Sequence, residues 1–215
     1  MEHDDDGASD PKVRLRSDDE LEAQSRGLRA LCDMLGAAGI PFLLSGGTLL
    51  GAARDGDFIR WDWDVEVSVR SEDVAGRLDE LVARAAEVGF TLVKRDDEPN
   101  NLKLVLEREG SIFELQAYLR EGRRRTRRDY RTEQRFFDGA TTIELRGQVY
   151  PCMGPLDEYL TDRYGDWRTP LRTADKSRYL SPSYFRRAAW LRRADGLLRA
   201  VRRRLGAGPR QVRSG

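Results

Sequence analysis

The chain has 215 residues, a length that suits one ordinary domain with an appendage. Hydrophobic residues make up 39% of the sequence and charged residues 35%, so the chain is polar but holds enough large apolar side chains to fold. No apolar run approaches the roughly 18 residues of a membrane span, and the acidic beginning of the chain does not have the basic and apolar regions of a secretory signal. We therefore expect a cytoplasmic protein.

The cysteine and histidine content limits the chemistry. Cys32 and Cys152 lie far apart without a paired-cysteine motif, which excludes a disulfide framework or a cysteine-type zinc site. The single histidine, His3, lies in an acidic stretch, so mechanisms that need a histidine base or ligand are not expected. Any catalysis is therefore expected to depend on carboxylates.

The net charge of +1 conceals an acidic part and a basic part. Residues 1–110 hold 14 basic and 25 acidic side chains, a net charge of −11, whereas residues 111–215 hold 24 and 12, a net charge of +12. A basic part can attract phosphates, nucleic acid or an anionic membrane, and charge alone does not choose among these partners.

The chain begins with a segment of low hydrophobicity. Residues 1–16 contain few large apolar side chains, which predicts a disordered acidic leader. Ser17 and Glu20 then form the Ser-x-x-Glu pattern of a capping box, and leucines at helical spacing predict a helix that ends at Gly36 or Gly39. We next expect a buried strand at 40–44, a short helix at 49–54 and a turn at 55–57.

Residues 62–69 alternate strictly between polar and apolar side chains, which is the two-residue period of a β-strand. The acidic residues take the even positions, so their carboxylates are predicted to lie on one face of the strand. Residues 71–73 are expected to cap a second helix that runs to about Val88.

The remaining elements complete an α/β protein with a mixed β-sheet flanked by helices. We expect strands at 90–94, 102–107 and 112–119, a long loop at 120–135 that includes the arginine cluster Arg123–Arg128, short strands at 141–145 and 148–150, a helix from 155 to 164, and an arginine-rich helix that starts at Ser181. The predicted organisation is a leader at 1–16, a catalytic domain at 17–175, and a C-terminal helix and tail at 176–215.

Three carboxylates on one face of a strand repel one another and call for a counter-charge. Asp62, Asp64 and Glu66 have hard oxygen ligands that favour Mg²⁺ or Mn²⁺ over zinc, and substrate phosphates often complete the shell of Mg²⁺. Glu114, flanked by apolar residues on a later strand, is a further candidate ligand. The alternative is a solvated strand face without a metal.

A glycine pair precedes the acidic strand and offers a phosphate site. Gly46 and Gly47 follow a predicted strand and precede a helix, so backbone N–H groups there can approach a phosphate closely. A tight turn without a ligand explains the same pattern.

Two separated stretches are similar to the signature of the LicD/fukutin-related family. The first runs from Leu44 to Arg54 (Leu-Ser-Gly-Gly-Thr-Leu-Leu-Gly-Ala-Ala-Arg) and continues from Gly56 to Val67 (Gly-Asp-Phe-Ile-Arg-Trp-Asp-Trp-Asp-Val-Glu-Val). The second, from Tyr159 to Pro170, resembles the Tyr-Gly-x-Trp…Pro element of that family. The resemblance covers roughly residues 28–175 and implies a nucleotidyltransferase-like fold.

The resemblance also implies a reaction. Members of this family move an alcohol phosphate, such as phosphocholine or ribitol phosphate, from a CDP-activated donor to a sugar hydroxyl of a glycan, with release of CMP. The family's metal ligands would fall on Asp64 and Glu66, with Glu114 as a third carboxylate and Asp62 as their neighbour. Glu114 is expected either to bind the metal or to accept the proton of the attacking hydroxyl.

The same resemblance implies how the donor is held. Gly46, Gly47 and Thr48 would cradle a phosphate, and Arg54 would offset charge as the nucleotide leaves. A surface ion pair of Arg54 with Asp57 or Asp62 is an equal alternative for that arginine.

Several aromatic and basic residues carry an expected structural role. Trp63 stands where the family often has an acid and is expected to point into the core, and core packing is the expected role of Tyr164 and Trp167. The Arg123–Arg128 cluster is expected to be a solvated basic loop, with binding of an anionic donor or acceptor as the alternative. The C-terminal helix is expected to dock on the acidic part of the chain, with an anionic membrane surface, such as the inner membrane face, as the alternative.

Two other functions remain open from the sequence. One keeps the fold but transfers a nucleoside monophosphate from an NTP to a small hydroxyl or amine compound, with release of pyrophosphate. The other is a nucleic-acid-binding module that uses the basic part; it leaves the acidic strand unexplained, so nucleic acid is not the expected partner.

Overall fold

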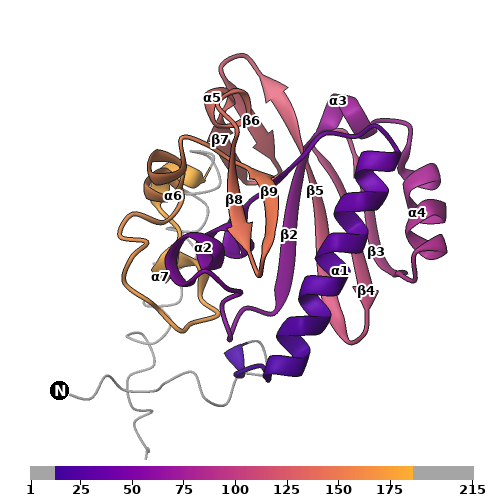
Figure 1. The fold of residues 1–215 in the computed structure, drawn as a ribbon. Coiled ribbons are helices and arrows are strands. Elements are labelled where there is room, and N and C mark those ends of the chain that lie inside the picture. Colours follow the sequence, from indigo (N-terminus) through magenta and orange to yellow (C-terminus); the bar gives the residue numbers. More distant parts are fainter. Residues whose placement is uncertain (1–12, 186–215) are drawn as a thin grey trace, which may run out of the picture.

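The structure is a computed structural model that describes residues 13–185. In this part of the chain a mixed nine-stranded sheet is flanked by helices, which confirms the expected α/β class (Figure 1). The strand order is β3-β4-β5-β2-β1-β9-β8, and β6 and β7 extend from the end of β5. The strands are β1 (Phe42–Leu44), β2 (Asp64–Arg70), β3 (Thr91–Glu98), β4 (Asn101–Arg108), β5 (Ser111–Glu121), β6 (Arg124–Arg127), β7 (Tyr130–Glu133), β8 (Thr141–Leu145) and β9 (Gln148–Cys152).

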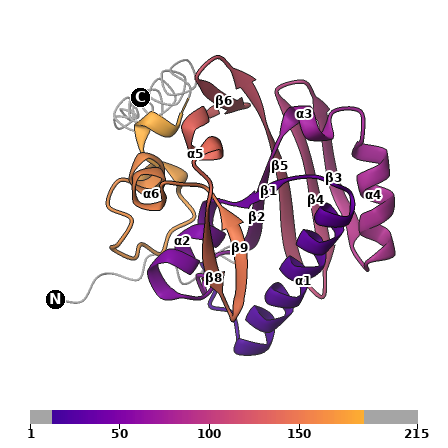
Figure 2. The same ribbon diagram turned by 45° about the horizontal axis from the view of Figure 1, so that its top comes forward.

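Helices cover the sheet and connect its strands (Figure 2). They are α1 (Asp18–Ala37), α2 (Gly46–Asp55), α3 (Ser71–Val74), α4 (Leu78–Glu87), α5 (Gln134–Asp138), α6 (Leu156–Tyr164), α7 (Lys176–Tyr179) and a 3₁₀ helix at Pro182–Tyr184. None of the helices between residues 13 and 185 has both the length and the apolar character needed to cross a membrane.

Helix α1 begins where the capping box predicts. The Ser17 hydroxyl accepts the N–H of Glu20, and the Glu20 carboxylate accepts the N–H of Ser17 in return. This exchange satisfies two N–H groups that a helix start otherwise leaves without partners. The buried leucine stripe of α1 packs against β5 and fixes which face of the sheet is the core.

The central strands β2 and β5 separate the core from the polar face. Val65, Val67 and Val69 are at most 1% exposed and lie on the α1 side of β2. The alternating residues Asp64, Glu66 and Ser68 lie on the opposite side of the strand, as its two-residue period requires. In the parallel register of β2 with β5, Glu66 lies beside Glu114, so the two strands gather acidic side chains on the polar face. The strand itself begins at Asp64, so Asp62 lies in the preceding turn rather than within the strand.

The helix expected from residue 71 to Val88 is two helices. Helix α3 ends at Val74 and α4 begins at Leu78, because Gly76 takes a left-handed conformation with φ 74° and interrupts the helical path. The prediction of one continuous helix was therefore wrong.

The expected loop at 120–135 is also wrong. The segment contains the end of β5, the hairpin of β6 and β7, and the start of α5. Arginine content suggested solvation, but Arg125 is 1% and Arg127 7% exposed because partners from distant parts of the chain cover them. Glu72 pairs with Arg125, and Tyr118 and Tyr130 lie against Arg127.

The predicted ends of the domain need correction. Residues 1–12 of the predicted leader lie outside the described part, but Val13 is buried and its carbonyl accepts a hydrogen bond from Arg172 Nε at 2.9 Å, so residues 13–16 pack on the domain.

At the other end, the described residues 176–185 also pack on the domain: Leu180, Tyr184 and Phe185 form a small apolar cluster with Tyr130. The predicted helix from Ser181 is a single 3₁₀ turn up to Tyr184, and its continuation, with the predicted membrane or acidic-surface contact, lies outside the described residues.

We predict that Gly27→Ala in α1 destabilises the protein. An alanine normally stabilises a helix interior relative to glycine, but here a Cβ would lie 2.1 Å from Cζ of the buried Phe113 ring. The overpacking should lower the free energy of unfolding by about 1–3 kcal/mol, measured by urea denaturation. Gly36→Ala in the same helix is the control, because no atom lies within 4 Å of its Cβ position; it should raise stability by about 0.5–1 kcal/mol. Equal effects of the two substitutions would contradict this packing account.

Candidate functional site

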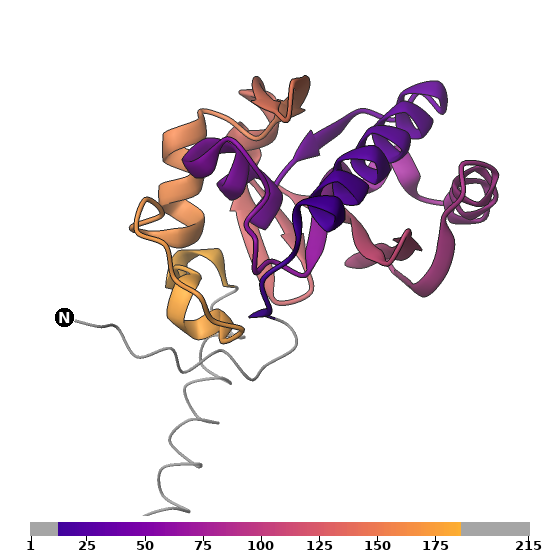
Figure 3. The ribbon, with the colours of Figure 1, turned by 60° about the horizontal axis from the view of Figure 1, so that its bottom comes forward.

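A cavity of about 610 Å³ lies on the polar side of β2. Its walls come from α2, the turn before β2, the β6–β7 hairpin, the end of α6 and the segment from 166 to 180. Figure 3 shows α2, α6 and α7 together on one side of the molecule, away from α1 and α4. The volume is typical of sites for small ligands, and residues distant in sequence meet here.

The two glycines at the start of α2 make room for carboxylates. A Cβ at Gly46 would lie 1.5 Å from Oε2 of Glu66, and one at Gly47 would lie 1.7 Å from Oδ2 of Asp62. Gly46 also has a positive φ of 59°. Any larger residue would therefore push the acidic side chains away from the helix start.

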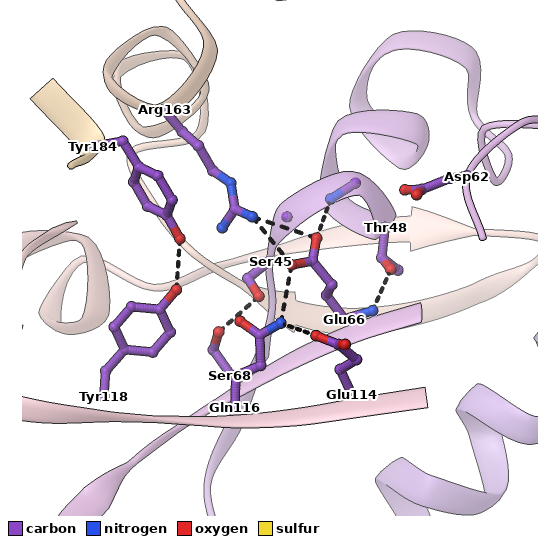
Figure 4. Close-up of polar contacts among 12 residues, drawn as sticks. Ser45, Thr48, Asp62, Glu66, Ser68, Glu114, Gln116, Tyr118, Arg163 and Tyr184 are labelled. Carbon is purple, nitrogen blue, oxygen red and sulfur yellow. Dashed lines mark hydrogen bonds and ion pairs between the residues drawn. The ribbon is translucent and has the colours of Figure 1, made fainter. Parts of the chain in front are cut away.

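Glu66 occupies the N-terminus of α2. Its Oε2 accepts the Gly47 N–H at 2.6 Å, and its own backbone N–H donates to Thr48 Oγ1 at 2.8 Å (Figure 4). Arg163 Nη2, from α6, lies 3.1 Å from Oε1. Burial alone would raise the pKa of Glu66, but Arg163, Lys176 and the Gly47 N–H outweigh it and hold the pKa at about 2. Glu66 is therefore an anion at neutral pH.

Glu114 lies behind Glu66 and has its own counter-charge. Lys103 Nζ is 2.5 Å from its Oε1, and Gln116 Nε2 is 2.6 Å from its Oε2. The same Gln116 nitrogen donates to Glu66 Oε1 at 3.1 Å, so the amide bridges the two carboxylates (Figure 4). Glu114 is not among the residues that line the cavity. Its role as a ligand or base stays a prediction.

Asp62 and Asp64 line the cavity and have no ion-pair partner within residues 13–185. Asp62 accepts the N–H of Trp63 at 3.0 Å. Burial and the neighbouring Glu66 raise the pKa of Asp62 to about 7. Burial also raises the pKa of Asp64, and the repulsion of Asp62, Glu66 and Glu114 adds to the effect. These two carboxylates lack the positive charge that Glu66 and Glu114 have.

The donor chemistry at Asp62 and Asp64 fits a hard divalent cation, because both offer carboxylate oxygens into a cavity and neither forms an ion pair in the described part of the protein, where Arg16, Arg163 and Lys176 act on them only through space. The described residues contain no group of three or more acidic, histidine or cysteine side chains that could hold a metal together. Glu66 and Glu114 contact cations in this structure. The larger predicted set of Asp62, Asp64, Glu66 and Glu114 stays a prediction, and oxygens of water or substrate would complete the shell of a metal at Asp62 and Asp64.

The residues predicted to hold a phosphate are near the cavity but already have partners. The Gly47 N–H donates to Glu66, and Thr48 is buried and accepts the Glu66 N–H. Arg54 lines the cavity and pairs with Asp55 at 2.7 Å. The alternative prediction, an ion pair of Arg54 with Asp57 or Asp62, is wrong. Asp57 instead forms an ion pair with Arg146 at 2.7 Å, and no described cation lies within pairing distance of Asp62. Phosphate binding by these residues stays a prediction.

Aromatic residues form much of the cavity wall. The expectation that Trp63 points into the core is wrong: it is 37% exposed and lines the cavity, because it precedes the strand and does not follow its alternation. Tyr164 and Trp167 pack on the core as expected, but both also line the cavity.

Five charged residues that line the cavity were not among the predicted site residues: Arg127, Arg163, Asp166, Lys176 and Arg178. Arg163 lies inside the second stretch that resembles the family signature, so its position in that motif was an available signal. Arg127 and Lys176 carry no local signal, since only the fold brings them to the cavity.

Comparison with known proteins agrees with the resemblance seen in the sequence. Residues 39–138 match the family described as LicD/FKTN/FKRP, nucleotidyltransferase domain. Over 75 residues, which are 35% of this chain, the sequence is 44% identical to the ribitol 5-phosphate transferase FKRP of mouse and of human. The match spans only 15% of the length of the mouse protein and 14% of the human one. The LicD/fukutin-related resemblance is thereby confirmed.

Solved structures give a weaker likeness. The solution structure of the antibiotic-resistance factor ANT(2″)-Ia has a TM-score of 0.48 and 17% identity over 87% of this chain and 95% of that one. A crystal structure of ANT(2″)-Ia with adenylyl-2″-tobramycin has a TM-score of 0.44 and 15% identity over 61% of this chain and 69% of that one. Neither likeness is close enough to inform function.

We predict that Asp62 lowers stability as the pH rises. Its pKa is raised from 3.8 to about 7 in the folded protein, so the unfolded chain releases this proton first and the free energy of unfolding falls between about pH 4 and pH 7. Asp62→Asn removes this effect. Its gain in Tm over the wild type should be larger at pH 8 than at pH 5, measured without divalent metal. Asp33→Asn, on the exposed side of α1, is the control. A gain that does not change with pH would contradict the titration of Asp62.

Proposed function

Because residues 39–138 match the nucleotidyltransferase domain of the LicD/FKTN/FKRP family, we propose that this chain is a metal-dependent phosphotransferase. It moves an alcohol phosphate from a CDP-activated donor to a sugar hydroxyl of a glycan or glycoconjugate and releases CMP. The 44% identity to two proteins named ribitol 5-phosphate transferase supports this class of donor. The observation that carries the proposal is the pair Asp62 and Asp64, two carboxylates without a counter-charge at the wall of a cavity.

Asp62 and Asp64 would hold Mg²⁺ or Mn²⁺. Mg²⁺ is commonly bound by one or two carboxylates together with substrate phosphates, which matches two acids beside an open cavity. When bound, the cation neutralises charge on the diphosphate of the donor. Binding of the substrate phosphates would strengthen metal binding, because two carboxylates leave most of the Mg²⁺ shell to oxygens of substrate or water.

The other residues of the site position the acidic strand. Arg163 and the Gly47 N–H hold the Glu66 carboxylate in place, and Gln116 links Glu66 to Glu114. In phosphoryl transfer most of the catalysis comes from positioning and charge neutralisation. Arg54 lines the cavity, where it could leave its ion pair with Asp55 and pair instead with the negatively charged nucleotide that departs.

We predict that the purified chain with Mg²⁺ releases CMP from a CDP-alcohol, and that Asp64→Asn reduces this release by more than about 100-fold. Removing mere partners of metal ligands already costs about 10- to 100-fold, so removing a ligand should cost at least as much. The measurement is ³¹P NMR with mass analysis over a panel of CDP-alcohols and NTPs, with sugar acceptors. Asp33→Asn should retain full activity.

The products decide between the reactions. Release of CMP that needs metal supports the proposal and identifies the alcohol. Release of pyrophosphate from an NTP would instead show nucleoside monophosphate transfer on the same fold. Full activity of Asp64→Asn would contradict the assignment of this residue to the metal.

We predict a second effect of Asp64→Asn that does not depend on turnover. Without metal the substitution should raise Tm, because it removes one of several carboxylates that repel each other. Addition of Mg²⁺ should raise the Tm of the wild type beyond the value with CDP alone, since ligands that bind only the folded state stabilise it, and should add nothing to the effect of CDP on the variant. Differential scanning fluorimetry measures both. An equal response of the wild type and the variant to Mg²⁺ and CDP would contradict metal binding at Asp64.

A further inference from the structure

Two buried arginines on β6, Arg125 and Arg127, differ in their ion-pair partners among the described residues. Arg125 and Arg127 are two residues apart, so their side chains lie on the same side of the strand. Arg125 is compensated: Glu72 accepts from it at 2.5 Å, the Tyr118 carbonyl at 2.8 Å, and its guanidinium lies 4.9 Å from the centre of the Phe137 ring. A carboxylate partner therefore accounts for the burial of Arg125.

Arg127 has no such carboxylate. It is 7% exposed, and none of the described acidic residues lies within 4 Å of its guanidinium. Its neighbours are aromatic: the ring centre of Tyr118 lies 5.7 Å away and that of Tyr130 5.4 Å away. The Tyr118 hydroxyl is a hydrogen-bond partner, but the buried Nε atom has none. Burial of a charged group is unfavourable, but Tyr118, Tyr184 and Glu114 offset it and raise the pKa of Arg127. The surroundings therefore keep the side chain charged although no described carboxylate pairs with it.

The acids nearest to Arg127 are already engaged. Glu66 and Glu114 act on it only through space, because Glu66 pairs with Arg163 and Glu114 with Lys103. Neither carboxylate is free to neutralise Arg127 as well. The described part of the chain offers Arg127 no other acid, so an anion bound in the cavity would compensate its charge.

A second cation, Lys176, lies near the Tyr130 ring, and it also acts through space on Asp64 and Glu66. Lys176 Nζ, from α7, is 5.7 Å from the centre of the Tyr130 ring, and the described residues give it no ion pair. Lys176 and Arg127 both line the cavity that holds Asp62 and Asp64. The cavity thus has an acidic part that attracts a cation and a basic part, at Tyr130, that has no anion.

We propose that Arg127 and Lys176 form a binding subsite for a phosphate group of the substrate, distinct from the carboxylates that would hold the metal. Arginine in a buried position suits this role, because its rigid fork of N–H donors matches the oxygens of a phosphate. The identification of the anion as a phosphate rests on the proposed function, whereas the need for an anion rests on the geometry alone. The phosphate belongs either to the CDP-activated donor or to a phosphorylated acceptor.

The test compares Arg127→Gln with Arg124→Gln in the full chain. Arg124 is on the same strand and exposed, so it is a matched control. Binding of inorganic phosphate and of CDP is measured by ³¹P NMR titration and calorimetry, without metal. Arg127→Gln should weaken phosphate binding about tenfold or more, the usual scale for a charged hydrogen bond, and Arg124→Gln should leave it unchanged. Lys176→Gln, an exposed residue whose loss cannot disturb the core, should weaken binding in the same direction.

Thermal stability separates a ligand site from a structural role. If Arg127 serves only the fold, its neutral variant should have a lower Tm and unchanged phosphate binding, because the variant loses the hydrogen bond to Tyr118 and the contacts with the Tyr118 and Tyr130 rings. A lower Tm of Arg127→Gln together with unchanged binding of phosphate and CDP by both Arg127→Gln and Lys176→Gln would overturn the proposal.

Competition identifies the source of the phosphate. If inorganic phosphate still binds when CDP is saturating, and Arg127→Gln abolishes that binding, the subsite holds a phosphate of the acceptor. If CDP displaces phosphate, and CDP but not CMP binds more weakly to Arg127→Gln, the subsite holds the donor. If the wild type transfers no alcohol phosphate but Arg127→Gln loses anion binding, the subsite is supported and the proposed reaction is refuted. If the wild type transfers alcohol phosphate and Arg127→Gln retains both transfer and anion binding, the reaction is supported and the subsite is refuted.

Discussion

The position of one carboxylate organises the site. Glu66 places an oxygen where a side chain at Gly46 would begin, and this close approach lets it accept the Gly47 N–H at the start of α2. A helix N-terminus favours a negative charge, and Arg163 from α6 adds a full positive charge. Three segments that are distant in sequence, the start of α2, the strand β2 and the helix α6, are joined through Glu66. The cavity exists because these three segments meet there.

The balance of charge around Glu66 explains what the rest of the cavity lacks. Glu66 has Arg163 and Glu114 has Lys103, so these acids are satisfied within the protein. Asp62 and Asp64 are left as unpaired acids at one part of the wall, and Arg127 is left as a buried cation at another. Both arrangements are unfavourable in an empty protein, and a metal with a phosphorylated substrate would relieve both. Functional sites commonly retain charged groups whose burial lowers the stability of the folded protein.

Short-range patterns predicted much of the fold and the location of the site. The capping box at Ser17 and the alternation from Asp64 onward depend on neighbouring residues, and both predictions are confirmed. The helix expected at 49–54 begins earlier, at Gly46, so the glycine pair forms its first turn. Long-range compensation could not be predicted. The partners of Arg127 come from β5 and β7, so a run of arginines was taken for a solvated loop. Likewise, the sequence placed four acids together, but it contained no information that Arg163 and Lys103 would neutralise two of them.

The central claim is that Asp62 and Asp64, rather than Glu66 and Glu114, receive the cation when substrate is present. The most direct measurement is anomalous diffraction from crystals grown with Mn²⁺ and CDP. The account predicts a manganese peak between the carboxylates of Asp62 and Asp64 that is also bound by phosphate oxygens, with the pairs Glu66–Arg163 and Glu114–Lys103 intact. A manganese ion bound by Glu66 and Glu114 with those pairs broken, or no ion in the cavity while CDP is bound, would contradict it.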